Sequence, residues 1–265
     1  MAEFEEQEIL RWEKGEVEQI SDWVVVESSL ELVVNDRSVV TLLCSPERPK
    51  SLAVGYLWSE GLIERLEVVQ SVDHMPGGKR VDVRIETDHI DLESYFSRKR
   101  ALTSSCGRAS AIIEKLEDLS VEKDKSMSMP EMSDLTELMR ELQKKAELFR
   151  KTGGSHTAAL AGQKEVKYLA EDIGRHNAVD KVIGQAVRDG RGLDDLVLLT
   201  SGRLSSEMVL KAIRSSIPIL VSRSAPTTLA VRMGRITGLG VVGFVRGNRL
   251  SIYSGKGMFK EISDG

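Results

Sequence analysis

The sequence has little cysteine and proline and no long hydrophobic run. Its 265 residues include only two cysteines and six prolines. Two cysteines cannot build the disulfide framework of a small secreted protein, and this usage is typical of a reducing compartment. No apolar run approaches the roughly 20 residues needed to span a bilayer, and the acidic first residues do not resemble a signal peptide. We therefore expect a cytoplasmic protein without membrane insertion.

Several catalytic signatures are also missing. The chain has no G-x-S-x-G nucleophile elbow and no G-x-x-x-x-G-K-[ST] phosphate loop, which argues against a serine hydrolase and a P-loop nucleotidase. The zinc signature of the nucleotide deaminases is absent as well, so no tightly held protein metal is expected. The net charge of −4 gives no general attraction to nucleic acid or to an anionic membrane.

Short β-branched runs dominate the first 100 residues. Residues 1–18 are charged and have few hydrophobic anchors, so we expect a loose arm there. Cys44 ends a predicted strand and has no basic or glycine-rich neighbour, which favours a structural role for it. The expected strands are residues 23–27, 30–34, 39–44, 68–72 and 80–85, with one helix at residues 46–63 and a hairpin around Pro76-Gly77-Gly78.

Strands alternate with helices in the second half of the chain. After a helix at about residues 133–149, which Ser133 can cap, strands are predicted at residues 156–161, 166–170, 196–200, 218–222, 241–245 and 249–253, and helices at residues 178–188, 206–215 and 227–237. Such alternation predicts an α/β fold with a partly parallel sheet. We therefore predict a β-rich N-terminal domain at residues 1–100 and an α/β domain at residues 101–265.

Three loops after predicted strands each combine a glycine or a hydroxyl group with an arginine. Ligands of α/β sheets usually bind at the carboxyl ends of the strands, and helix N-termini and arginine side chains bind phosphate. Three such loops suggest a ligand with more than one phosphate, although each loop by itself could be an ordinary solvated turn. The candidate binding residues in these loops are Ser201, Arg203, Arg223, Ser224, Phe244, Val245, Arg246, Gly247, Asn248 and Arg249.

The densest group of polar residues runs from Glu171 to Lys181, at a predicted loop-to-helix junction. His176 in this run could be a metal ligand, a proton-transfer group or a structural histidine. A metal ligand is the least favoured of these, because zinc sites need three or four clustered ligands. We include His176 among the candidate binding residues, and His156 is a second candidate for moving a proton or orienting a group.

Cys106 lies in the stretch Thr103-Ser104-Ser105-Cys106-Gly107-Arg108-Ala109-Ser110, just before an apolar, helix-like run. A thiol near a helix N-terminus has a lowered pKa, because the unpaired N–H groups and the helix dipole favour an anion. Cys106 is therefore the candidate catalytic nucleophile. The alternative is that a cysteine beside serine and glycine is only a small residue in a tight turn.

Several motifs in this order resemble those of the formate dehydrogenase accessory sulfurtransferase family. They are Cys106, Gly154-Ser155-His156-Thr157, the run from Glu171 to Lys181, Thr200-Ser201-Gly202-Arg203 and Ser222-Arg223-Ser224-Ala225-Pro226-Thr227. The run of eleven residues, E-D-x-G-R-H-N-A-x-D-K, is the specific one, whereas the cysteine stretch alone is not. The resemblance extends from about residue 20 to the end of the chain.

This resemblance implies a cytidine-deaminase-like α/β domain without the deaminase zinc site, a smaller N-terminal domain and a homodimer. It implies that Cys106 accepts sulfur from a cysteine desulfurase as a persulfide. The sulfur then passes to a molybdenum (or tungsten) bis(molybdopterin guanine dinucleotide) cofactor, bound as a substrate by residues 244–249, and the product activates formate dehydrogenase. Many members have Cys-x-x-Cys here, but this chain has Ala109 as the fourth residue. A dithiol redox role is thereby excluded, whereas a persulfide relay needs only one thiol.

Two other functions remain open at this point. The protein could be a non-catalytic chaperone that binds the finished cofactor and docks it on its client, in which case Cys106 would be a packing residue. It could also be a nucleotide-modifying enzyme of the deaminase-like fold, which the missing zinc ligands disfavour.

Overall fold

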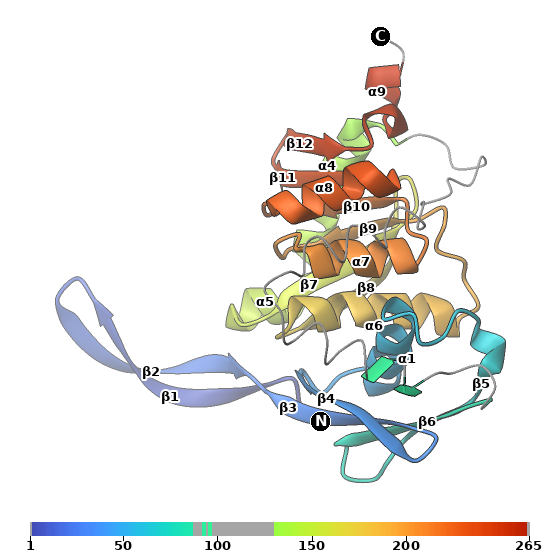
Figure 1. Ribbon diagram of the computed structural model, residues 1–265. Helices are drawn as coiled ribbons and strands as arrows, with labels where there is room; N and C mark the ends of the chain where they lie inside the picture. The colour runs from blue at the N-terminus through green and yellow to red at the C-terminus, as the bar shows by residue number, and fades with distance from the viewer. Residues whose placement is uncertain (1, 87–91, 94, 97–129, 264–265) are drawn as a thin grey trace.

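The computed structural model describes residues 2–86, 92–93, 95–96 and 130–263 (Figure 1). Cys106 and the helix predicted after it lie outside the described residues. The strands are β1 (Phe4–Glu13), β2 (Glu16–Val25), β3 (Ser28–Val34), β4 (Arg37–Cys44), β5 (Val69–His74), β6 (Arg80–Ile85), β7 (His156–Ala161), β8 (Val166–Asp172), β9 (Val197–Thr200), β10 (Ile219–Ser222), β11 (Gly240–Arg246) and β12 (Arg249–Ser254). The helices are α1 (Pro49–Ser59), α4 (Met132–Lys145), α5 (Glu147–Thr152), α6 (Arg175–Arg188), α7 (Ser206–Arg214), α8 (Thr228–Thr237) and α9 (Lys260–Ser263), with short 3₁₀ turns η1 (Leu66–Val68) and η3 (Lys256–Met258).

The described strands form three sheets. β1 and β2 make a separate hairpin, β4-β3-β6-β5 make a four-stranded sheet, and β12-β11-β10-β9-β7-β8 make a six-stranded sheet. The predicted fold class is therefore confirmed, since a β-rich N-terminal half is followed by an α/β half with a partly parallel sheet. No helix among the described residues is both long and apolar enough to cross a membrane.

The strand directions of the six-stranded sheet decide where its loops lie. β9, β10 and β11 are parallel to one another, whereas β7 runs antiparallel to both β8 and β9. β8 therefore points in the same direction as β9. The carboxyl ends of β8, β9, β10 and β11 consequently meet at one edge, together with the first residues of β7 and β12. We call this the carboxyl edge; it comprises Asp172, Thr200, Ser222 and Arg246 with the loops that follow them, and His156 and Arg249.

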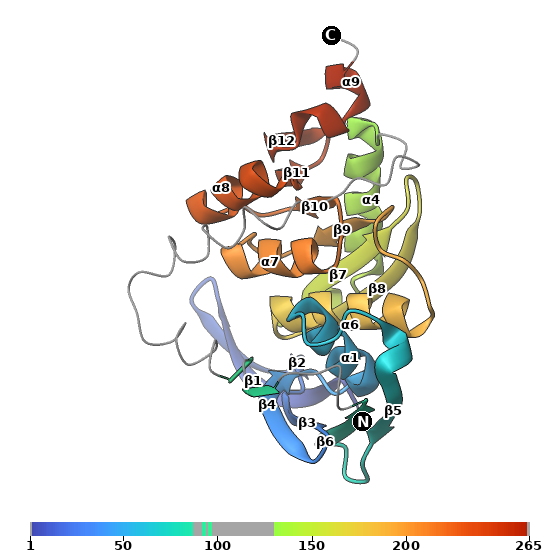
Figure 2. The ribbon, with the colours of Figure 1, turned by 45° about the vertical axis from the view of Figure 1, so that its right-hand side comes forward.

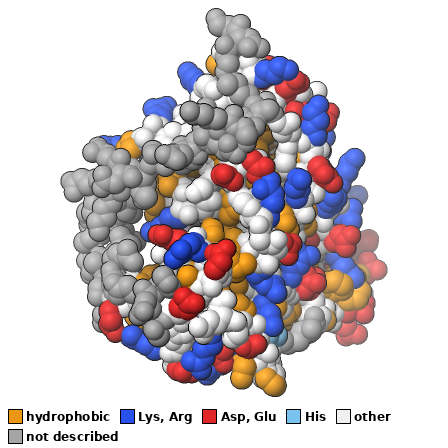
Figure 3. Space-filling view, turned by 90° about the vertical axis from the view of Figure 1, so that its right-hand side faces the viewer, with side chains coloured by type: hydrophobic (Ala, Val, Ile, Leu, Met, Phe, Trp, Pro, Cys, Tyr) orange, Lys and Arg blue, Asp and Glu red, His pale blue; other side chains and the backbone are white. Residues whose placement is uncertain are grey.

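Helices cover both faces of this sheet (Figures 1 and 2). α6, α7 and α8 pack on one face, where Val179, Val209 and Leu220 belong to the larger hydrophobic cluster. α4 covers the other face, where Leu138 and Val221 belong to a second cluster. On the outer surface shown in Figure 3, acidic and basic side chains are interspersed and neither sign forms a continuous field among the described atoms.

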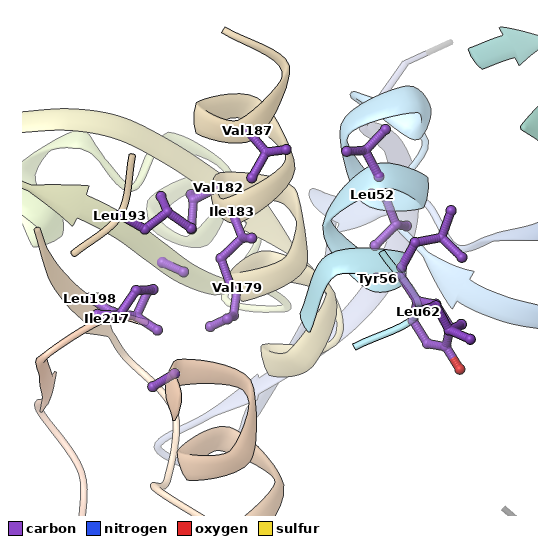
Figure 4. Packing of buried hydrophobic residues seen from close by; sticks show 14 of the residues in the cluster. Leu52, Tyr56, Leu62, Val179, Val182, Ile183, Val187, Leu193, Leu198 and Ile217 are labelled. Atoms are coloured by element: carbon purple, nitrogen blue, oxygen red, sulfur yellow. The ribbon is translucent and has the colours of Figure 1, made fainter. Parts of the chain in front are cut away.

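α1 connects the two halves by packing directly on α6 (Figure 4). The contact is close because each helix presents a glycine: a Cβ on Gly55 would overlap the Asp180 carbonyl, and a Cβ on Gly184 would overlap the Ser51 carbonyl. The larger hydrophobic cluster accordingly runs from the four-stranded sheet through α1 to α6 without a break. The division into domains at residues 1–100 and 101–265 stays a prediction.

The expectation of a loose arm at residues 1–18 was wrong. These residues form β1 and the start of β2, which pair in register from Phe4 opposite Val25 to Glu13 opposite Glu16. The turn between them has positive φ angles at Lys14 (51°) and Gly15 (95°), as a two-residue hairpin turn of type I′ requires. Both strands are rich in charged residues and bury few side chains, so the sequence pattern did not indicate a strand pair.

Helix boundaries differ from the predictions in smaller ways. α4 begins after Glu131 rather than at a Ser133 cap, and α6 begins at Arg175, three residues before the predicted start, so His176 lies in its first turn. Ser205 occupies the N-cap position of α7, but its hydroxyl makes no capping hydrogen bond.

Candidate functional site

The carboxyl edge brings the three predicted arginine loops together. The loops after β9 and β10 are joined by Ser222, whose Oγ donates to the Gly202 carbonyl at 2.6 Å and accepts from the Ser224 N–H at 2.9 Å. The Gly202 N–H in turn donates to Thr200 Oγ1 at 3.1 Å. Ser222 is buried, so these bonds fix the loop backbones from beneath and leave their outer side chains free to meet a ligand.

The end of β11 is joined to the same two loops. The Phe244 N–H donates to the Ser224 carbonyl at 3.0 Å, and Arg246 Nε donates to the Arg223 carbonyl at 3.1 Å. Phe244 has a φ of 54° at an irregularity of the β11–β12 pairing. A Cβ on the preceding Gly243 would lie 2.9 Å from Pro226 Cδ and 3.1 Å from the Ser224 carbonyl oxygen. Glycine is thus required where β11 meets the loop after β10.

The turn between β11 and β12 is held from the other face of the sheet. Arg140 of α4 donates to the Gly247 carbonyl at 3.4 Å and to Asn248 Oδ1. Sequence reasoning missed Arg140, because nothing in its helical spacing distinguishes it from a solvated arginine. It positions the turn that carries Arg246 and Arg249.

The side chains of the predicted binding residues differ in their exposure to solvent. Arg203, Arg223, Arg246 and Arg249 are exposed, and none of them forms an ion pair with a carboxylate among the described residues. Val245, in contrast, is buried and belongs to the cluster beneath α4. Its side chain therefore packs in the core, and only its backbone can face a ligand. Exposed arginines without acidic partners fit an anionic ligand.

His156 stands at the carboxyl edge beside the loop after β9. Its Nδ1 lies 3.3 Å from Ser201 Oγ, and that hydroxyl accepts from the Thr157 N–H at 3.0 Å. The Ser201 hydroxyl keeps its own proton and can donate it to Nδ1. Burial, reinforced by the nearby Arg175 and His176, lowers the pKa of His156 below its ordinary 6.5. A neutral imidazole at this edge can accept a proton or donate a hydrogen bond at pH 7.

His176 links the first turns of α6 and α7. Its Nε2 lies 3.2 Å from Glu207 Oε2, and this interaction lowers the pKa of Glu207. Among the described residues no group of three or more His, Cys, Asp and Glu side chains could hold a metal ion. Of the three roles considered for His176, this contact with Glu207 favours that of a structural histidine at the rim of the carboxyl edge.

The rest of the dense run is built into the core. Lys181 Nζ lies 2.7 Å from Asp172 Oδ2 and donates to Ser45 Oγ at 2.8 Å, and both charged side chains are at most 1% exposed. Asp180 pairs with Lys211 at 2.9 Å in a second buried site, with Ser59 Oγ donating to the same Asp180 oxygen at 2.6 Å. We call Ser45, Ser59, Asp172, Asp180, Lys181 and Lys211 the α6 junction. Because both sites include a serine from the first 60 residues, the junction ties the N-terminal half to the α/β half.

Glu171 and Cys44 also have structural surroundings. The Glu171 carboxylate accepts from the backbone N–H groups of Leu148 and Phe149 at 2.7 and 2.9 Å, which fixes the start of α5. Cys44 is 3% exposed, and burial, with the nearby Asp172 charge, raises its thiol pKa to about 11. Cys44 is therefore protonated at neutral pH, and its predicted structural role is consistent with this position.

Comparison with known proteins identifies the family. The model of the FdhD/NarQ family matches residues 25–260. The chain belongs to this family. It is 36% identical over 252 residues to the "Sulfur carrier protein FdhD" of Listeria innocua, covering 94% of this chain and 96% of the relative. It is 32% identical over 249 residues to the protein of the same name from Bacillus subtilis, covering 93% and 94%.

A solved structure supports the same fold. A crystal structure described as that of a candidate formate dehydrogenase accessory protein from Desulfotalea psychrophila aligns with a TM-score of 0.80 and 24% identity, covering 98% of this chain and all of the other. The predicted family resemblance is thus confirmed. The curated relatives carry the name of sulfur carrier protein, and the chain shares their family.

Proposed function

We propose that this chain is a sulfurtransferase that carries sulfur as a persulfide on Cys106. The donor is a cysteine desulfurase, and the acceptor is the molybdenum (or tungsten) bis(molybdopterin guanine dinucleotide) cofactor of a formate dehydrogenase. The protein acts in the cytoplasm as a homodimer. Two relatives bear the name of sulfur carrier, and the thiol inventory supports Cys106 as the carrier, since the only other cysteine is buried and has a raised pKa.

Loading of Cys106 is a thiol–persulfide exchange that needs no external oxidant. The Cys106 thiolate attacks the outer sulfur of the donor persulfide, the S–S bond of the donor breaks, and the donor cysteine leaves as a thiolate. A new S–S bond on Cys106 keeps the transferred sulfur at the same oxidation level. One thiol is sufficient for this step, so Ala109 in place of a second cysteine does not impede it.

The proposal that this protein binds the cofactor rests on one observation, which is that the three arginine loops are linked to one another at the carboxyl edge. Arg223 and Arg246 are exposed, lie in adjacent loops and are joined through the bond from Arg246 Nε to the Arg223 carbonyl. Arginine recognises phosphate oxygens with paired N–H groups. The spacing of several such groups along one edge suits a ligand with linked phosphates, as in a guanine dinucleotide. The neutral His156 beside Ser201 supplies a hydrogen-bonding group at the same edge.

Sulfur loading tests the proposal. The protein is incubated with a cysteine desulfurase and free cysteine, and its peptides are analysed by mass spectrometry without reductant. We expect a single added sulfur atom on the Cys106 peptide of the wild type and of Cys44→Ala, and none on Cys106→Ala. Sulfur found on the Cys106→Ala protein would refute the persulfide relay.

The same variant separates a sulfurtransferase from a chaperone that only holds the finished cofactor. Alkylation of Cys106, or Cys106→Ala, is expected to abolish activation of formate dehydrogenase. Full activation by the blocked protein would show that the chain acts as a cofactor-binding chaperone instead.

A further inference from the structure

A long stretch near the end of the chain contains no acidic residue. Residues 208–260 hold nine lysines and arginines but neither aspartate nor glutamate, although the whole chain has a net charge of −4. The stretch therefore carries a net charge of +9, and the rest of the chain carries −13. Segregation of charge on this scale creates a local field that attracts a partner of opposite sign.

Most of this positive charge is not neutralised by the fold. Three of the nine cations, Lys211, Arg214 and Lys260, pair with carboxylates from other parts of the chain. The other six are exposed and have no carboxylate partner within the part of the chain that the structure describes. These six are Arg223, Arg232, Arg235, Arg246, Arg249 and Lys256.

Two of the six arginines lie on the outer side of α8. Arg232 and Arg235 are three residues apart, and Ile236 follows Arg232 by four, so the three side chains share one face of the helix. Ile236 is 37% exposed. α8 lies at the outside of the molecule beside β12, where Arg235 Nε donates to the Tyr253 carbonyl at 3.3 Å (Figures 1 and 2). We call Arg232, Arg235 and Ile236 the α8 face; it presents an apolar side chain flanked by two cations.

The α8 face is separate from the loops of the carboxyl edge. α8 begins at Thr228, shortly after the loop that carries Arg223. Because a helix rises 1.5 Å per residue, Arg235 lies about 10 Å along the helix from that edge. A cation in the last turn also stabilises its own helix, which accounts for Arg235 but not for Arg232 or for the exposed Ile236. The α8 face therefore needs an explanation beyond the ligand of the edge.

An acidic protein surface fits the α8 face better than a nucleic acid does. Arginines around an apolar contact are typical of protein–protein interfaces. Nucleic-acid sites instead combine cations with polar side chains that bind phosphate or with aromatic rings that stack on bases. Ile236 is aliphatic and offers neither. The absence of carboxylates from residue 208 to residue 260 also removes the like charge that would repel an acidic partner.

We propose that the α8 face docks an acidic surface of the client protein that receives the ligand of the carboxyl edge. The identity of this client, a formate dehydrogenase, rests on the proposed function, whereas its acidic chemistry follows from the residues of this chain. Because α8 starts beside the loop after β10, a protein docked on α8 lies next to the loops that release the ligand. Arg232 and Arg235 pair with carboxylates of the client, and Ile236 packs against an apolar side chain among them.

Biolayer interferometry with immobilised formate dehydrogenase apoprotein tests the docking. Arg232→Glu/Arg235→Glu is expected to weaken binding about tenfold, mainly through slower association, because it reverses the long-range attraction. Ile236→Ser is expected to weaken binding severalfold through faster dissociation, because it removes the apolar contact. Lys144→Glu/Arg150→Glu makes the same change of net charge at two exposed cations of α4 and α5. This matched control is expected to bind as the wild type does, and circular dichroism establishes that each variant is folded.

Further measurements on the same variants separate the docking from the sulfur relay. Sulfur loading of Cys106 and binding of guanosine diphosphate are both expected to be unchanged in Arg232→Glu/Arg235→Glu. Added salt is expected to weaken client binding more in the wild type than in this variant. Salt-sensitive client binding by a wild type that loads no sulfur would refute the relay but still support the docking.

Four results would overturn the docking proposal. The first is client binding that persists in Arg232→Glu/Arg235→Glu, and the second is an equal loss in the Lys144→Glu/Arg150→Glu control. The third is a loss of client binding that only parallels a loss of guanosine diphosphate binding. The fourth is a wild type that binds duplex RNA through the α8 face but does not bind the client.

Discussion

The α6 junction and the carboxyl edge are both rich in charge, but they use it in opposite ways. At the junction, Asp172 and Lys181 are buried and each neutralises the other. At the edge, Arg223 and Arg246 are exposed and lack carboxylate partners among the described residues, while the buried Ser222 and backbone groups fix the loops that carry them. A dense polar motif can thus be structural, whereas sparse arginines on fixed loops stay exposed and available to an anion.

The largest expected effect comes from breaking the junction. Lys181→Met leaves the Asp172 carboxylate buried without its cation, which is expected to lower the free energy of unfolding by about 3–5 kcal/mol. Urea unfolding followed by circular dichroism measures this change. Asp172→Asn/Lys181→Met, which removes both charges, is expected to recover part of the loss. A loss below about 1 kcal/mol in the single variant would mean that the junction does not hold the two halves together.

A smaller effect is expected from removing charge at the edge. Arg246→Ala and Arg249→Ala are each expected to weaken the binding of guanosine diphosphate severalfold, while the free energy of unfolding changes by no more than about 0.5 kcal/mol. Isothermal titration calorimetry measures the affinity. Arg65→Ala, an exposed arginine in the first half of the chain, serves as the matched control with unchanged affinity. Unchanged affinity in both edge variants would argue against phosphate binding at these two arginines.

The smallest effect is a pH dependence that arises from His156. Its pKa in the folded protein lies below the ordinary 6.5, so the unfolded chain binds the proton more readily and stability falls as the pH drops through 6.5. His156→Asn removes this contribution. Thermal unfolding between pH 7.5 and pH 5.5 is therefore expected to show a steeper loss for the wild type than for the variant. Parallel curves would show that the His156 proton is not linked to folding.

Much of the α/β half could be predicted from the sequence, because its strands are short apolar runs separated by glycine, serine and proline. The prediction that the loops around Arg203, Arg223 and Arg246 share one edge follows from strand order, since parallel strands end on the same side. The observed pairing of β9, β10 and β11 confirms this placement.

The rest required three-dimensional information. The role of Lys181 depends on Ser45, 136 residues earlier, and no local pattern in the sequence connects them. The β1–β2 hairpin buries few of its residues, so it lacks the hydrophobic alternation that would reveal a strand. Arg140 acts on the Gly247–Asn248 turn across the sheet edge, a contact that only the packing of α4 creates.

The most direct test of the account follows labelled sulfur from Cys106 to its acceptor. Wild type and Arg223→Ala/Arg246→Ala are loaded with ³⁵S-labelled sulfur by a cysteine desulfurase, then mixed with the molybdenum guanine dinucleotide cofactor and a formate dehydrogenase apoprotein. We predict equal loading of both proteins, with label transferred by the wild type and retained by the edge variant. Transfer by the variant at the rate of the wild type would contradict this prediction.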